Sequence, residues 1–246
     1  MIQSSDKIYI DGTYFSHNPG LGKDDALWKA DKVKSMLQKH RIAARSVCEV
    51  GSGSGMILQY LSEMFPEIEI FAGFDISPDA IKQSQKIQNN KLSFFQSSIP
   101  ENKNFDLLLM LDVIEHVDDY YQFLRNIRHC SNQFIFHIPL DLSCRMILKP
   151  HILLNERKSV GHIHYFTKET IFWALEDTGY IIKDWFYTKP LTDTSASPNL
   201  FRWFKKKGRN MLFSIAPDLC ARLFGSYSVM LYLEKNQSYE ADNLDL

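Results

Sequence analysis

Acidic residues and glycines recur at spacings that could bind a nucleoside. The stretch 47–55 reads VCEVGSGSG and places Glu49 two residues before Gly51, the first of three alternating glycines. Glycines at such a turn adopt backbone angles closed to other residues and let a ligand approach the main chain. Asp75 lies 24 residues after Gly51, a spacing at which a carboxylate can accept both ribose hydroxyls. Asp75 could equally cap the helix that follows, because Asp and Ser are both good N-caps.

The elements that must position these residues alternate along the chain between strands and helices. Short apolar runs predict buried strands, and helical apolar spacing predicts helices between them. Such alternation is typical of a parallel sheet with right-handed crossovers, whose ligands sit at the carboxyl ends of the strands. The expected strands are 46–50, 68–74, 92–95, 105–111 and 133–138, and the expected helices are 25–39, 56–64, 78–87, 120–127 and 168–177.

Three motifs resemble one enzyme family. The glycine spacing at 51–55 is G-x-G-x-G with an acid two residues before it, whereas the dinucleotide fingerprint is G-x-G-x-x-G. The chain also carries D-V-I-E-H-V at 112–117 and G-H-x-H-Y-F-T at 161–167. Together these motifs resemble the class I S-adenosylmethionine-dependent methyltransferases of small-molecule type, in the methyltransferase-domain superfamily. The resemblance covers roughly residues 46 to 233.

The resemblance implies an α/β fold. Its doubly wound, mainly parallel seven-stranded sheet would have the Rossmann-like methyltransferase order 3-2-1-4-5-7-6, with insertions after strands 5 and 6. Strands 180–187 and 227–233 would form an antiparallel edge. We expect an N-terminal arm and helix over the cofactor site (1–45), a methyltransferase domain (46–235) with insertions at about 140–164 and 190–226, and a disordered tail (236–246).

The resemblance also implies S-adenosyl-L-methionine as the cofactor. Many relatives carry an acid after the third strand that meets the adenine amino group, and this chain has serines there. The residues expected to bind the cofactor are Glu49, Gly51, Ser52, Gly53, Gly55, Asp75, Ile76, Ser97, Ser98, Leu111, Asp112, Tyr14 and Lys29.

Histidines supply the candidates for catalysis. His116 and His137 could each act as a general base, because the unperturbed pKa of histidine lies near working pH. His116 could equally wall the adenine pocket or cap the next helix. The residues expected at the substrate are His162, His164 and Tyr165. Two histidines at i and i+2 lack a third ligand at a readable spacing, so we expect no metal.

Composition narrows the function class. The chain has 246 residues, 45% of them apolar, and a net charge of −1 that offers no general field for nucleic acid. Four scattered cysteines and a first segment without the regions of a signal peptide favour a cytoplasmic protein. Aromatic and basic residues alternate over 200–209, which is typical either of a segment lying on an anionic membrane surface or of a solvated helix.

We therefore expect in-line methyl transfer to an oxygen or nitrogen of a small molecule, such as a sugar or a lipid-linked metabolite. One alternative is a nicotinamide-dependent oxidoreductase, which the glycine spacing at 51–55 disfavours. Another is a protein that binds the cofactor without turnover. The oligomeric state has no signature in the sequence.

Overall fold

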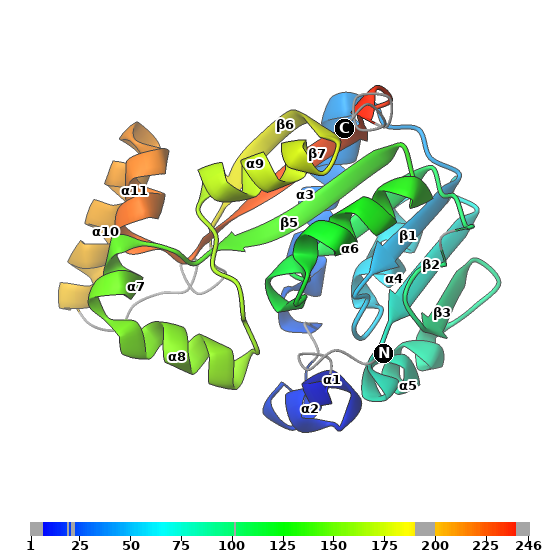
Figure 1. Ribbon diagram of the computed structural model, residues 1–246, viewed down its shortest axis with the longest axis horizontal. Coiled ribbons are helices and arrows are strands. Elements are labelled where there is room, and N and C mark those ends of the chain that lie inside the picture. Colours follow the sequence, from blue (N-terminus) through cyan, green and yellow to red (C-terminus); the bar gives the residue numbers. More distant parts are fainter. Residues whose placement is uncertain (1–6, 19, 21–22, 101, 190–199, 240–246) are drawn as a thin grey trace.

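The computed structural model describes residues 7–18, 20, 23–100, 102–189 and 200–239, and the side chains of all of these except 23–24 and 200–206. Its centre is a seven-stranded sheet in the order β3-β2-β1-β4-β5-β7-β6 (Figure 1). This order confirms the one expected from the sequence. Strands β1 to β5 run parallel, while β7 is antiparallel to both of its neighbours. The bounds are β1 Ser46–Val50, β2 Ile70–Asp75, β3 Leu92–Gln96, β4 Leu107–Leu111, β5 Gln133–Leu140, β6 Tyr180–Thr188 and β7 Tyr227–Lys235.

Strand β4 is buried on both faces of the sheet. All five of its residues are buried, as a continuous apolar run requires when helices cover both faces. Alternate residues of β4 pack on opposite sides: Leu108 and Met110 join one core cluster, and Leu107, Leu109 and Leu111 join the other.

Helices that cover opposite faces of the sheet contribute the other residues of these two clusters. The first cluster packs against α6 (Tyr120–Ile127) and α9 (Lys168–Asp177), and the second against α3 (Lys23–His40), α4 (Met56–Met64) and α5 (Pro78–Ser84). In Figure 1, α6 and α9 lie in front of the sheet and α3 lies behind it. Three single turns of 3-10 helix connect elements: η1 Gln85–Ile87, η2 Ile114–His116 and η3 Arg128–Cys130.

The N-terminal arm is partly helical in the described residues. It contains two short helices, α1 (Lys7–Ile10) and α2 (Thr13–His17). Gly12, at φ 81°, makes the turn between them. Helices of four and five residues are too short to show the periodicity on which a sequence-based prediction depends.

The described parts of both insertions contain helices. The first contains α7 (Cys144–Leu148) and α8 (Pro150–Ser159), and the second contains α10 (Leu200–Ile215) and α11 (Pro217–Phe224). The basic and aromatic stretch 200–209 falls in α10, where most of its side chains lie outside the described residues. Residues 240–246, which make up most of the tail expected to be disordered (236–246), also lie outside the described residues. Among the described helices, none is both long enough and apolar enough to cross a membrane.

Candidate active site

A cavity of about 700 Å³ opens at the carboxyl ends of β1, β2 and β4. Most residues expected to bind the cofactor or the substrate line it: Tyr14, Lys29, Glu49, Gly51, Ser52, Gly53, Asp75, Ile76, Ser97, Ser98, Leu111, Asp112, His116 and His162. Four expected site residues do not line it: Gly55, His137, His164 and Tyr165. The topology brings these strand ends together, because parallel neighbours end at the same edge.

The glycine turn after β1 forms one wall of the cavity. Gly51 has φ 71°, and a Cβ atom at this position would meet a Cγ atom of Val113 at 2.4 Å. The amide groups of Gly51 and Ser52 both donate to the carbonyl oxygen of Phe74, at 2.8 and 3.1 Å. The turn is therefore bound to the end of β2, and Gly51, Ser52, Gly53 and Ser54 all line the cavity.

Gly55 has a packing role instead of the expected contact with a cofactor. It precedes α4 with φ 76°, and a Cβ atom there would meet the ring of Phe94 at 2.4 Å. Gly55 allows the helix to begin close to β3, which carries Phe94.

Two acids flank the glycine turn. Glu49 is 1% exposed, its Oε2 atom has no hydrogen-bond partner, and burial raises the pKa of its carboxyl well above the usual range. Asp75 accepts hydrogen bonds from the amides of Gly53 and Ser77, both at 2.8 Å, and burial raises its pKa. The N-cap of α5 is Ser77, whose hydroxyl accepts from the Ala80 amide. Asp75 therefore holds the turn and is not the helix cap.

Asp112 contacts Lys29 and His137 at the cavity wall. Its carboxylate lies 2.7 Å from Lys29 Nζ and 2.6 Å from His137 Nδ1. Burial would raise the pKa of Asp112, but His137 and Lys29 outweigh it and hold that pKa below its usual range. Asp112 has φ 56°, a left-handed conformation that few residues other than glycine adopt.

His137, one of the two candidate bases, does not line the cavity. It is 3% exposed, and its Nε2 atom lies 2.8 Å from the hydroxyl of Thr188. Because both ring nitrogens have protein partners and the ring does not line the cavity, His137 has the geometry of a positioning residue for Asp112 and not of a base that meets a substrate.

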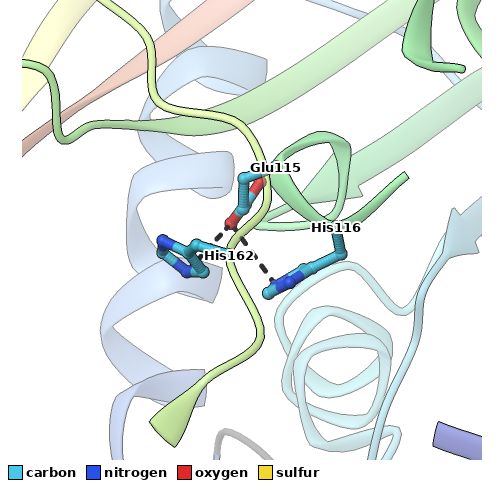
Figure 2. A group of neighbouring side chains, drawn as sticks. All are labelled: Glu115, His116 and His162. Atoms are coloured by element: carbon cyan, nitrogen blue, oxygen red, sulfur yellow. Dashed lines mark ion pairs between the residues drawn. The ribbon is translucent and has the colours of Figure 1, made fainter. Parts of the chain in front are cut away.

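The far end of the cavity carries Glu115, His116 and His162 (Figure 2). Burial lowers the pKa of His116 to about 4, with the neighbouring His162 adding to the effect. Burial, together with Asp112, raises the pKa of Glu115 to about 8. Burial opposes the charge on His162, yet its hydrogen bond to Asp141, together with the nearby carboxyl groups of Glu115, Asp141 and Glu156, outweighs burial and raises the pKa of the imidazole. A neutral imidazole with a lone pair can thus face the cavity at His116.

His164 and Tyr165 lie away from the cavity, contrary to the expectation that they contact the substrate. His164 Nε2 lies 2.9 Å from the carbonyl oxygen of Val117, and the Tyr165 hydroxyl donates to the carbonyl of Leu153. Their hydrogen bonds tie the segment after Gly161 to η2 and α8.

The N-terminal helices cover the end of the cavity that holds His116. The rings of Tyr9 and Tyr14 lie 5.7 and 6.4 Å from the His116 ring, and both tyrosines line the cavity. The sequence predicted Tyr14 as a cofactor-binding residue but did not predict Tyr9, because a helix as short as α1 shows no periodicity. The sequence analysis also did not identify Glu115 and Asp141 as site residues. Glu115 could have been found from its place beside His116 in the motif D-V-I-E-H-V.

Comparisons with known proteins agree with this geometry. A family model described as a methyltransferase domain matches residues 24–182. Among curated proteins, a ubiquinone biosynthesis O-methyltransferase of Rickettsia canadensis (strain McKiel) is 27% identical over 154 residues, which cover 58% of this chain and 65% of that protein. The match thus spans slightly less than two thirds of the relative.

Two solved structures show the same fold at low identity. The plantazolicin methyltransferase BpumL, in complex with a monoazolic desmethylPZN analog and SAH, is 15% identical with a TM-score of 0.60; the match covers 95% of this chain and 94% of that one. A methyltransferase in complex with the Trm112 methyltransferase activator of Haloferax volcanii is 14% identical with a TM-score of 0.61, covering 96% and 99%.

Proposed function

Because this chain belongs to the methyltransferase-domain family, we propose that it transfers the methyl group of S-adenosylmethionine to an oxygen or nitrogen atom of a small molecule. The observation that carries the proposal is a single cavity into which Glu49, the glycine turn and Asp75 all face from two neighbouring strand ends. A nucleoside with a charged amino-acid tail is complementary to this arrangement of acids and bare peptide units.

The residues present fit such a cofactor. Glu49 offers a buried carboxylate oxygen without a partner, which suits the ammonium group of the methionine part. Asp75 suits the ribose hydroxyls, and Gly51 and Gly53 line the cavity without side chains of their own. Ser97 and Ser98 line the cavity next to Asp75, at the end of β3, where an adenine would lie. When bound, the cofactor supplies a methyl carbon already activated by the positive sulfur beside it.

The chain's own contribution is orientation and the exclusion of water. Asp112, held by Lys29 and His137, lines the same cavity. His116 lies beyond it, under the rings of Tyr9 and Tyr14. Holding two reactants in line within a closed site can supply a large share of catalysis. The acceptor therefore belongs at the end of the cavity that His116 and His162 line.

An oxygen acceptor is the better supported choice. The curated relative is named as an O-methyltransferase, and a hydroxyl must lose a proton to react, for which this end of the cavity provides imidazole and carboxylate groups. Oxygen acceptors with an acidic hydroxyl, such as phenols, fit this chemistry best.

The test is incubation with S-adenosylmethionine and a panel of phenols, sugars and amines, with products read by mass spectrometry. We expect a mass gain of one methylene on a hydroxylated acceptor. Asp75→Asn should weaken cofactor binding about 10-fold or more, since it removes a charge-assisted acceptor worth roughly 1.5–3 kcal/mol, whereas the exposed Asp31→Asn in α3 should not. Wild-type affinity in Asp75→Asn would place the cofactor elsewhere.

A further inference from the structure

Three side chains at the acceptor end of the cavity form a group of metal-ligating type. Glu115 Oε1 lies 3.7 Å from His116 Nε2 and 3.9 Å from His162 Nε2. One donor atom from each residue lies within 4.8 Å of the other two. Figure 2 shows the carboxyl group of Glu115 pointing between the two imidazole rings.

The fold by itself leaves Glu115 unexplained. Its side chain is fully buried, and neither carboxyl oxygen has a hydrogen-bond partner. Buried polar groups are almost always hydrogen-bonded, so a fully buried carboxyl group with two unpartnered oxygens is unusual. A cation between Glu115 and the two histidines would give this group a partner.

His162 is oriented as a metal ligand is. Its Nδ1 atom lies 2.8 Å from Asp141 Oδ2, which leaves Nε2, 3.9 Å from Glu115 Oε1, as the nitrogen that a cation would bind. A carboxylate that fixes the tautomer of a ligating histidine is the usual partner one layer out from a metal. The amides of Ile163 and His164 both donate to the backbone carbonyl of Glu115, at 2.9 and 3.1 Å. These bonds fix the two segments that carry the donors against each other.

We propose that Glu115, His116 and His162 bind a divalent transition-metal cation. Two imidazole nitrogens and one carboxylate oxygen suit Zn²⁺, Mn²⁺, Fe²⁺ or Co²⁺, whereas Ca²⁺ and Mg²⁺ prefer an all-oxygen set. Bond lengths of about 2.0–2.2 Å would require the donors to approach by on the order of 1 Å. Three protein ligands leave coordination positions open, and the three residues line the cavity, so those positions face an acceptor.

The site extends the proposed function, on which the following role depends. A cation here would lower the pKa of an acceptor hydroxyl that faces it. The hydroxyl proton passes to water, the oxygen lone pair forms the new bond to the methyl carbon, and the carbon–sulfur electron pair stays on sulfur. The acceptor class is then a phenol or another hydroxylated molecule, and His116 serves as a ligand and not as the base.

The test titrates chelator-stripped, full-length protein with Zn²⁺, Mn²⁺ or Co²⁺ alone, by calorimetry. We expect one ion per chain, and a visible Co²⁺ absorption spectrum from nitrogen and oxygen ligands. Glu115→Gln and His162→Gln should each lower the affinity at least 100-fold. Asp141→Asn should lower it 10- to 100-fold, because Asp141 orients His162. The matched control is His151→Gln, an exposed histidine in α8.

Binding of S-adenosylhomocysteine, measured on each variant without metal, separates the two proposals and reports whether the variant folds. Metal binding without methyl transfer would reject the proposed function and keep the site. Nucleoside binding with no cation bound at millimolar concentration, or with affinity unchanged in Glu115→Gln and His162→Gln, would reject the site. Should the variants not fold, wild-type protein decides: cation should slow diethylpyrocarbonate modification of His116 and His162 at least 10-fold, and an unchanged rate rejects the site.

Discussion

Buried charges determine the chemistry of the cavity at the scale of single residues. Lys29 is 8% exposed and lies 2.9 Å from Asp25 and 2.7 Å from Asp112. Burial opposes its charge, but the two carboxylates outweigh burial and hold the pKa of Lys29 above its usual range. Breaking such a pair on one side leaves an uncompensated charge, so Lys29 and Asp112 are best understood as one unit.

Glu49 has no partner of this kind, and its pKa predicts a dependence of stability on pH. The folded-state pKa lies above the unfolded value, so the folded chain binds the proton more tightly. The stabilisation that protonated Glu49 contributes is present below the unfolded pKa of about 4.3 and is lost as the pH rises through the folded pKa.

We therefore predict that Glu49→Gln stabilises the ligand-free protein more at pH 8 than at pH 5, in urea unfolding monitored by circular dichroism. The same variant should bind S-adenosylmethionine more weakly at pH 8, because its amide cannot pair with the ammonium group. Glu63→Gln, on the exposed side of α4, is the control. An equal change in unfolding free energy at both pH values would contradict the first prediction.

The segment from Gly161 to Thr167 links two elements at the scale of secondary structure. It carries His162 from the cavity to the start of α9, where Thr167 and Thr170 form a capping box. The hydroxyl of Thr167 accepts from the Thr170 amide, and the hydroxyl of Thr170 accepts from the Thr167 amide. The helix start thus holds one end of the segment that positions His162.

Removal of this cap should loosen both the helix and the segment before it. Loss of an N-cap costs about 1 kcal/mol, so Thr167→Ala should lower the melting temperature by about 2–4 °C. Differential scanning calorimetry measures this change, and Glu176→Ala on the exposed face of α9 is the control. A melting temperature equal to that of the control would show that the box adds nothing to the stability of α9.

At the scale of the whole molecule, the cavity draws on separate parts of the chain. Its lining comes from α2, from the ends of β1, β2 and β4, and from residues of the first insertion. Figure 1 shows α1 and α2 at the same end of the sheet as α5 and below α6. A ligand in this cavity would contact several separate segments of the chain and should stabilise the folded protein against unfolding.

We predict that S-adenosylhomocysteine at 100 times its dissociation constant stabilises the protein by about 2.7 kcal/mol. For a chain of this size the melting temperature should rise by roughly 5–10 °C, as read by a thermal shift assay. Nicotinamide dinucleotides at the same concentration should not change it. A shift with the dinucleotide alone would favour the oxidoreductase alternative.

The sequence determined the sheet and one side of the site, because both depend on local patterns. Glycine spacing at 51–55, an acid after β2 and continuous apolar runs are readable without contacts, and the strand order followed from them together with the family resemblance. Parallel strands end at one edge, so Glu49 and Asp75 had to lie near each other once the sheet was inferred.

Only the tertiary structure decided which histidines face the cavity. Alternation along β5 shows that His137 belongs to a strand, but not that its ring meets Asp112 and Thr188. Likewise, His162 reaches Glu115 across 47 residues because backbone bonds from Ile163 and His164 hold the segment there. The spacing of residues in the sequence predicts neither the contacts of His137 nor that of His162. Each contact depends on how a long connection returns to the sheet.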